Sequence, residues 1–353
     1  MSPLAIFFLF LIHSSLAANT NIYNVQNYGA KSDGKTDSSK AFLSAWAAAC
    51  ASNTPATINV PSGKYLIHNA NFNGQTCKSK AITIHIIDGT LLAPSDYNVN
   101  SDDENWIKFE KVNGISIYGG TFDGQGAALW ACKNSNKNCP DGTTVLAQGN
   151  SPNTDGIHVK LSSGVGIMKS QIGTGDDCIS IGPGTSNLWI EGIACGPGHG
   201  ISIGSLGWKQ QELGVQNVTV KTVTFSGTTN GVRVKTWARP SSGFVRNILF
   251  QHIVMVNVKN PILIDQNYCP NHESCPHQGS GIKISDVTYQ DIRGTSATKI
   301  AVKLDCSITN PCSGIALEDL NLSYQNQQTE ASCVNARGRV SGLQKPNNCL
   351  LKN

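Results

Sequence analysis

The sequence has few charged and few aromatic residues, and it lacks any long apolar run beyond its first residues. Charged side chains make up 14% of the chain and aromatic ones 7%, whereas there are 35 glycines among 353 residues. This composition is typical of a turn-rich all-β protein rather than a helical one. The net charge of +4 is not gathered into a run of Lys and Arg, so no nucleic-acid partner is expected. No later stretch is apolar enough to span a membrane, and no linker or second domain is apparent.

The spacing of zinc ligands is also absent, because the chain has no CxxC pair with matching histidines. The 12 cysteines instead favour a disulfide-bonded protein outside the reducing cytosol. Several cysteines lie close together in the chain, which favours short-loop disulfides, although spacing does not determine the connectivity. The close pairs are Cys132 and Cys139, Cys269 and Cys275, Cys306 and Cys312, and Cys333 and Cys349.

The amino terminus has the pattern of a secretory signal. An apolar run from Leu4 to Ile12 is followed by the small residues of Ser15-Leu16-Ala17. We therefore expect a signal peptide at residues 1–17, a mature domain at 18–353, and an extracellular location. Asn217 and Asn321 stand in N-x-[ST] sequons, which are glycosylation sites in secreted proteins.

Short strands with alternating apolar residues recur along the chain. Their starts at residues 156, 178, 200, 231 and 261 are 22 to 31 residues apart, and a second set of strands, starting at 163, 186, 215 and 245, advances in step with the first. Two strand columns that advance together predict a coil of stacked turns. We therefore predict an all-β, single-domain, right-handed parallel β-helix, rather than a β-sandwich. Each strand of the first set has an apolar face and a polar face, the polar one carrying His158, Ser180, Ser202 and Arg233.

A short helix is predicted near the amino-terminal end of this coil. Thr36-Asp37-Ser38 precede apolar residues at helical spacing, which is the pattern of a capped amphipathic helix. Such a helix would cover the open end of the solenoid, where core and strand edges would otherwise be exposed. The apolar positions are Ala41, Phe42, Ala45, Trp46 and Ala49.

Polar side chains precede the strands of the first set. Asp155 and Asp177 are 22 residues apart, as are Asp177 and His199, and Asp176 adds another carboxylate. Equivalent positions on neighbouring turns lie about 4.8 Å apart. Carboxylates crowded in this way raise at least one pKa and can supply both a proton donor and a base, the pair that glycoside hydrolysis requires.

Other polar residues allow a structural interpretation. Asn230 and Asn260 stand at the same position before their strands, and we expect them to cap strand ends as an Asx ladder. Arg233 and Lys235 could form a solvated pair, but beside an acidic cluster they suit the carboxylates of a uronate ligand better.

These residues resemble the motifs of the polygalacturonases, glycoside hydrolase family 28, and are most similar to plant members, including pollen types. Further similarity lies in YGAKSDGKTD at 28–37, GGTFDGQG at 119–126 and IDQNYC at 264–269. The four family motifs stand in family order as Asn153-Thr154-Asp155, Gly175-Asp176-Asp177, Gly198-His199-Gly200 and Arg233-Val234-Lys235.

The resemblance implies hydrolysis of the galacturonan backbone of pectin with inversion. Asp176 matches the general acid, Asp155 and Asp177 match the pair that activates water, and His199 matches the histidine that supports the acid. The resemblance implies no cofactor and no metal, and we expect a monomer. The residues implied to hold galacturonate are Asn153, Gly200, Arg233, Lys235 and Tyr268.

The chain departs from the family between Cys139 and Asn153, where members usually carry roughly two more turns of about 20–25 residues each. We expect whole turns to be missing, so that the rest of the stack keeps its register and the turn of Asp155 rests on the Gly114–Gly126 region. A shortened support predicts weak or absent activity in a folded protein.

Two other functions compete with hydrolysis. One is a non-catalytic pectin-binding wall protein, which activity on polygalacturonate would exclude. The other is a Ca²⁺-dependent pectate lyase, against which the motif set argues and which a chelator would inhibit. The sequence leaves open internal or chain-end attack and the tolerance of methyl esters.

Overall fold

The computed structural model describes residues 20–95, 105–125, 155–270, 275–276 and 278–352. The expected signal peptide and the expected Cys132 and Cys139 pair lie outside the described residues. Among the residues described, no helix has the length and apolar character needed to cross a membrane.

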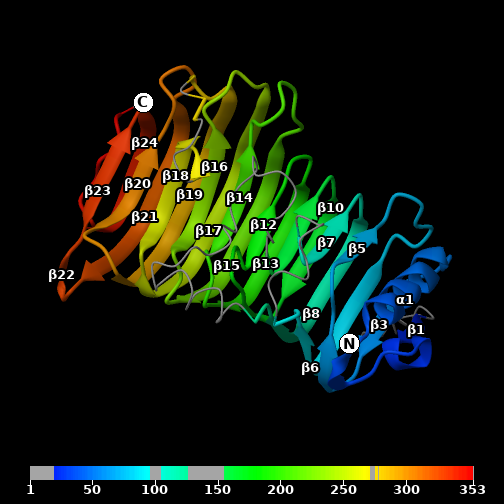
Figure 1. Ribbon diagram of the computed structural model, residues 1–353. Helices are drawn as coiled ribbons and strands as arrows, with labels where there is room; N and C mark the ends of the chain where they lie inside the picture. Colours follow the sequence, from blue (N-terminus) through cyan, green and yellow to red (C-terminus); the bar gives the residue numbers. More distant parts are fainter. Residues whose placement is uncertain (1–19, 96–104, 126–154, 271–274, 277, 353) are drawn as a thin grey trace, which may run out of the picture.

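The strands wind into a parallel β-helix, confirming the predicted fold, and Figure 1 shows them stacked from the amino-terminal to the carboxyl-terminal end. A first sheet follows one side of the coil, and its main path is β1 (Asn21–Asn24), β3 (Ala56–Val60), β6 (Ile82–Leu92), β8 (Asn113–Asp123), β10 (Ser163–Met168), β13 (Ser186–Cys195), β15 (Val215–Ser226), β17 (Gly243–Val258), β19 (Ile282–Ser296) and β21 (Cys312–Tyr324). Shorter strands join it: β2 (Asp33–Asp37), β4 (Gly63–Leu66), β11 (Gln171–Gly173), β24 (Ala336–Lys345) and β22 (Gln327–Gln328), the last antiparallel to β21.

A second sheet carries the strands of the first sequence column. It consists of β5 (Ala70–Asn73), β7 (Ile107–Glu110), β9 (Ile157–Lys160), β12 (Ile179–Ile181), β14 (Ile201–Leu206), β16 (Asn230–Trp237), β18 (Asn260–Tyr268), β20 (Ile300–Asp305) and β23 (Glu330–Val334). The register pairs the residues expected from the alternation: Ile157 with Ile179, Ile179 with Ile201, Ile201 with Val232, and Val232 with Ile262. All five are fully buried. Each such side chain stabilises the stack by about 1.5–3 kcal/mol.

The long strands of the first sheet bend at a column of left-handed residues. The φ angles of Gly192, Thr222, His252, Asp291 and Asp319 lie between 48° and 69°, and the pairing of their neighbours places these residues on successive turns. A strand cannot continue straight through this conformation. The strands of the first sheet therefore bend at the equivalent position on each successive turn of the coil. This bend lets the sheet wrap around the core.

The predicted helix is present as α1 (Ser39–Ala51), beside a short 3-10 helix η1 (Val25–Tyr28). Its expected apolar face is buried, and Trp46 packs edge-on against Phe72, with ring centroids 5.5 Å apart. The cap differs in detail, because Oδ1 of Asp37, rather than the side chain of Ser38, accepts from the backbone N–H of Ser39 at 2.9 Å. The helix lies at the amino-terminal end of the coil, as predicted (Figure 1).

Disulfides join cysteines on the same or neighbouring turns. The expected short-loop bonds Cys269–Cys275, Cys306–Cys312 and Cys333–Cys349 are confirmed. Two more bonds, Cys50–Cys77 and Cys178–Cys195, join residues whose distance in sequence gave no signal. No cysteine of the described residues is free.

The turn that carries Asp155 stacks directly on residues before position 126. Its strands β10 and β11 pair with β8, as expected for the Gly114–Gly126 region. The expectation is wrong for β9, which pairs with β7 at Lys108–Glu110, upstream of that region. The reason is the two-sheet coil: each strand pairs within its own sheet, and Gly114–Gly126 belongs mainly to the other one.

Candidate active site

Adjacent turns of the second sheet bring Asp155, Asp177 and His199 together. Each residue lies two positions before an isoleucine of β9, β12 or β14, and these isoleucines are paired in register. The 22-residue spacing therefore places the three side chains on successive turns, as predicted. Asp155, Asp176 and Asp177 are almost completely buried, at 3%, 3% and 0% exposure.

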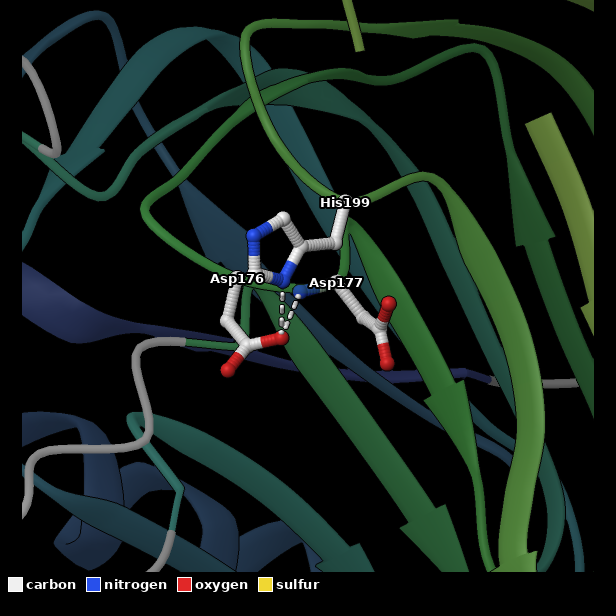
Figure 2. A group of neighbouring side chains, drawn as sticks. All are labelled: Asp176, Asp177 and His199. Carbon is white, nitrogen blue, oxygen red and sulfur yellow. Dashed lines mark hydrogen bonds and ion pairs between the residues drawn. The ribbon is translucent and has the colours of Figure 1, made fainter. Parts of the chain in front are cut away.

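Asp176 and His199 form a hydrogen-bonded pair. Nδ1 of His199 lies 2.9 Å from Oδ1 of Asp176, and the backbone N–H of His199 donates to the Asp176 carbonyl at 2.6 Å. The same carboxylate oxygen accepts from the backbone N–H of Asp177 at 2.9 Å. Figure 2 shows both bonds converging on this one oxygen, while the carboxyl group of Asp177 points to the other side.

Asp177 is held by side chains from the next two turns. Oδ1 accepts from Oγ of Ser202 at 2.8 Å and from Nη2 of Arg233 at 3.1 Å. Oδ2 accepts from Nζ of Lys235 at 2.9 Å. Arg233 and Lys235 thus both bind Asp177.

Asp155 is held differently, through a serine hydroxyl and a histidine ring. Oγ of Ser180 donates to Oδ2 of Asp155 at 2.5 Å, and Nδ1 of His158 lies 2.6 Å from the same hydroxyl. The positive charge of Lys235 favours the ionised form of Asp155, against the larger effect of burial.

These surroundings shift the pKa values of Asp155 and Asp176 in opposite directions. Burial, together with the charges of Asp176 and Asp177, raises the pKa of Asp155 well above its usual value. Burial works the same way on Asp176, but the charge and hydrogen bond of His199 outweigh it and lower the pKa of Asp176 to about 2. The cluster therefore contains one carboxyl that favours the protonated form and one that favours the ionised form, an arrangement suited to acid and base chemistry.

The two cations stay charged in spite of their burial. Burial alone would lower the pKa of Lys235 and that of Arg233, but the charge of Asp177 outweighs it, and both pKa values are raised. Tyr268 stands beside them, with the centroid of its ring 5.4 Å from Nζ of Lys235 and 6.0 Å from Cζ of Arg233. A charged and aromatic surface thus continues from the acidic cluster along the next turns.

Three of the predicted residues, Gly200, Asn230 and Asn260, have a structural explanation. Gly200 has φ +95°, and a Cβ atom there would lie 2.2 Å from the carbonyl oxygen of Asn230, so only glycine fits. The expected Asx ladder is confirmed, because Nδ2 of Asn260 donates to Oδ1 of Asn230 at 3.1 Å and Nδ2 of Asn230 donates to the carbonyl of His199 at 3.0 Å. Asn153 lies outside the described residues.

Asp176, Asp177 and His199 could also be considered as metal ligands, since their ligand atoms lie within 4.8 Å of one another. However, both oxygens of Asp177 already accept from Arg233 and Lys235. A divalent cation at this place would lie beside two fixed positive charges. The donor set therefore does not suit a metal ion.

Sequence reasoning missed the roles of three polar residues. His158, Ser180 and Ser202 were placed on the outward face of the second sheet without a role, and the structure shows the two serines bonded to Asp155 and Asp177. The signal was their position, since each serine stands one turn after the carboxylate it binds.

Fold and site together define the class of protein: a glycosidase-type enzyme with carboxyl groups in unlike protonation states on the face of a β-solenoid. Residues 50–145 and 140–343 match the model described as glycosyl hydrolases family 28. The chain belongs to this family.

Relatives agree with this assignment, and solved structures share the fold. The chain is 56% identical to a polygalacturonase of Prunus persica, covering 98% of each sequence, and 41% identical to an exopolygalacturonase of Platanus acerifolia, covering 92% of this chain and 97% of that one. An endo-xylogalacturonan hydrolase from Aspergillus tubingensis has a similar fold, with a TM-score of 0.60 at 20% identity over 92% of this chain and 98% of that one. An exopolygalacturonase from Thermotoga maritima matches with a TM-score of 0.50 at 16% identity, over 92% and 89% of the two chains.

The comparisons also bear on the turns that were expected to be missing. The alignment with the Prunus relative extends over 387 positions, more than the 353 residues of this chain, so the relative contains residues with no counterpart here. The family match comes as two segments that meet at residues 140–145, the region where turns were expected to be missing. None of these comparisons favours the inactive alternative over the hydrolase.

Proposed function

We propose that this chain hydrolyses the α-1,4-galacturonosidic bonds of polygalacturonan by a single displacement with inversion. The names of its relatives support the substrate, since they include polygalacturonases and exopolygalacturonases over nearly the whole chain. The observation that carries the proposal is the cluster of three buried carboxyl groups with Arg233 and Lys235 on the following turns. Acid and base groups act there beside cations that suit a uronate polymer.

In this mechanism Asp176 protonates the leaving oxygen, and Asp155 and Asp177 activate the attacking water. His199 supports the acid through the 2.9 Å bond between its Nδ1 and Oδ1 of Asp176. The charge and hydrogen bond of this same partner lower the pKa of Asp176 to about 2. Asp176 must therefore be protonated in the complex with substrate before it can give a proton to the leaving oxygen.

The pKa of Asp155 is also shifted in the direction opposite to the one its proposed role requires. Burial and its two acidic neighbours raise its pKa, whereas a base that activates water must be ionised. A raised pKa also makes a stronger base, so Asp155 suits proton abstraction once it is ionised. Activity should therefore require a pH high enough to ionise Asp155 and low enough for Asp176 to be protonated when substrate is bound.

Arg233, Lys235 and Tyr268 hold galacturonate in this proposal, together with Asn153 and the backbone at Gly200. Arg233 uses Nε and Nη2 for Ser202 and Asp177. Its Nη1 forms no hydrogen bond with the described residues, so its two N–H groups can donate to a substrate carboxylate. Lys235 uses one of its three N–H groups for Asp177.

The protein is proposed to act outside the cell, at the wall, as a monomer. The five disulfides of the described residues are consistent with an oxidising compartment. The sequon residues Asn217 and Asn321 are both exposed strand residues and are accessible as carriers of a glycan.

Digestion of polygalacturonate tests the proposal. The reducing ends released should have the inverted anomeric configuration in early NMR spectra, and a chelator should leave the rate unchanged. The sizes of the first products decide between internal and chain-end attack. Products with unsaturated-bond absorbance, or a rate abolished by chelation, would identify a lyase. A folded protein that binds the polymer without releasing reducing ends would favour the binding protein.

A further inference from the structure

His158 and Ser180 form a hydrogen-bonded chain to Asp155 that the roles above do not use. Nδ1 of His158 lies 2.6 Å from Oγ of Ser180, and this hydroxyl donates to Oδ2 of Asp155 at 2.5 Å. The direct distance from Nδ1 to Oδ2 is 3.9 Å, too long for a hydrogen bond. Ser180 is therefore the link between the ring and the carboxylate.

The fold leaves a specific space for this imidazole ring. A Cβ atom at Gly182, on the next turn, would lie 3.1 Å from both Cε1 and Nε2 of His158 and 3.0 Å from Cβ of Lys160. The glycine therefore lets the ring lie against the backbone. Only 15% of the His158 side chain is exposed.

The ring is neutral in this place. Burial and the charges of Lys160, Lys108 and Lys235 lower the pKa of His158 to about 3. Glu110, on β7, forms ion pairs with Lys108 and Lys160 at 3.9 and 3.7 Å and thereby offsets part of their charge. A neutral imidazole carries a single N–H, so its tautomer decides what it can donate.

The hydrogen bonds determine that tautomer. A serine hydroxyl has one proton, and Ser180 gives it to Asp155. Oγ of Ser180 can then only accept from His158, which requires the proton on Nδ1. The chain thus runs from Nδ1–H of His158 to Ser180 and from Ser180 to the Asp155 carboxylate.

The same device is repeated one turn further along. Nε of Arg233 donates to Oγ of Ser202 at 3.0 Å, and Ser202 donates to Asp177 at 2.8 Å. Each serine follows its aspartate by 25 residues. The two water-activating carboxylates of the proposed mechanism are thus both bound by a serine that is itself held by a second donor, a cation for Asp177 and a neutral ring for Asp155.

We infer that His158 is a positioning residue, which orients the Ser180 hydroxyl and so fixes the Asp155 carboxylate for its part in the reaction. The inference rests on the proposed function for its effect on rate, but not for the hydrogen bonds themselves. A bond from a hydroxyl to an ionised carboxylate is stronger than one to a neutral acid. Loss of the hydrogen bonds through Ser180 should therefore leave the Asp155 carboxylate both less ordered and harder to ionise.

Matched substitutions at one position test the rate effect. The amide nitrogen of His158→Asn takes the place of Nδ1 and can still donate to Ser180, whereas that of His158→Gln takes the place of Nε2 and cannot. We expect His158→Asn to stay within about 3-fold of the wild-type kcat, and His158→Gln and Ser180→Ala to lose about 10-fold or more with KM nearly unchanged. In His158→Gln and Ser180→Ala, the acid limb of the pH profile of kcat should shift to higher pH by about one unit.

His252→Asn serves as the control, because His252 also bonds to an aspartate, Asp291 at 2.8 Å, but on the exposed corner of the first sheet. Its pH profile should match the wild type. If His158 contacts the substrate instead, His158→Asn and His158→Gln will both raise KM without moving the acid limb, and the inference is wrong. Equal activity and equal profiles in all variants would overturn it as well.

A spectroscopic measurement tests the hydrogen bonds from His158 to Asp155 independently of catalysis. In ¹⁵N-histidine-labelled protein, His158 should remain neutral down to about pH 4 with its proton on Nδ1, a consequence of the pKa of about 3. Ser180→Ala should shift the ring toward the Nε2–H tautomer, because Nδ1 loses its acceptor. An Nε2–H ring in the wild type would overturn the inference even if the enzyme is active, and an Nδ1–H ring in an inactive protein would refute only the proposed function.

Discussion

Nζ of Lys235 lies 2.9 Å from Oδ2 of Asp177, and this ion pair spans two turns of the coil between a proposed substrate-binding residue and a proposed catalytic one. Both side chains are buried, at 8% and 0% exposure. Lys235 therefore has two tasks in the proposed mechanism, to attract the uronate carboxylate and to keep Asp177 ionised.

Lys235→Met tests this double role, because methionine keeps much of the length and removes the charge. Removing one partner of a buried ion pair costs about 3–5 kcal/mol. We expect polygalacturonate hydrolysis to fall by roughly 100-fold or more, and hydrolysis of methyl-esterified pectin to fall less. Rates on both polymers, measured beside thermal unfolding, check the prediction. Equal losses on the two substrates would assign Lys235 to Asp177 alone.

Asp176→Asn should abolish hydrolysis and leave the fold intact. The amide is nearly isosteric with the carboxyl group but has no acidic proton for the leaving oxygen. A loss of about 10²–10⁴-fold is expected for a positioned acid. Initial rates and the unfolding temperature should be measured on the same sample. Substantial turnover in the variant would remove Asp176 from the role of acid.

Asp155→Asn should stabilise the protein near neutral pH. The pKa of Asp155 is raised in the folded state by burial and by Asp176 and Asp177, so its favourable contribution is complete below the unfolded pKa of 3.8 and is lost as pH rises through the folded value. The uncharged amide avoids this loss. We expect a gain on the order of 1 kcal/mol at pH 7 that shrinks toward pH 4. Unfolding curves of both proteins should be measured across this pH range. A gain in unfolding free energy that did not change with pH would contradict the raised pKa of Asp155.

Loss of the Cys178–Cys195 disulfide should damage the site more than loss of Cys306–Cys312. Cys178 follows Asp177 directly, and its bond closes a loop of 17 residues beside the catalytic turns. A loop of about that size contributes about 3 kcal/mol. The double variant Cys178→Ala/Cys195→Ala should therefore lose both stability and kcat, whereas Cys306→Ala/Cys312→Ala, with a separation of 6 residues, should mainly lose stability. Similar kcat values in the two would show that the bond does not position the site.

Restoring turns before Asn153 tests the shortened support. In this chain β9 rests directly on β7 and β10 on β8. Insertion of the corresponding segment from the Prunus relative should lengthen the binding groove and raise kcat/KM on polygalacturonate by up to about 10²-fold, since small misplacements of catalytic groups are costly. Longer oligogalacturonates should gain more than short ones. Equal activity with and without the insertion would show that the missing turns are dispensable.

The sequence by itself determined the coil and the row of catalytic residues. The two-residue alternation of Ile157 and Ile179 fixes which side chains face the core, and the 22-residue period fixes which ones meet on adjacent turns. Backbone pairing then places Asp155, Asp177 and His199 in one row without any detail of the side chains. The spacing of apolar residues predicted helix α1 at the amino-terminal end of the coil in the same way.

Only the tertiary structure decided how these side chains are bound. Periodicity gives the face of a residue but not its rotamer, so it could not show that Lys235 and Arg233 turn toward Asp177 or that Ser180 links His158 to Asp155. It could not pair Cys178 with Cys195, because that bond depends on how far the chain travels before it returns. The pairing of β9 with β7 likewise joins residues about 50 positions apart, a separation that differs from the 22-residue period. These contacts join residues far apart in sequence, and their protonation follows from burial and charge that arise only when the turns have stacked.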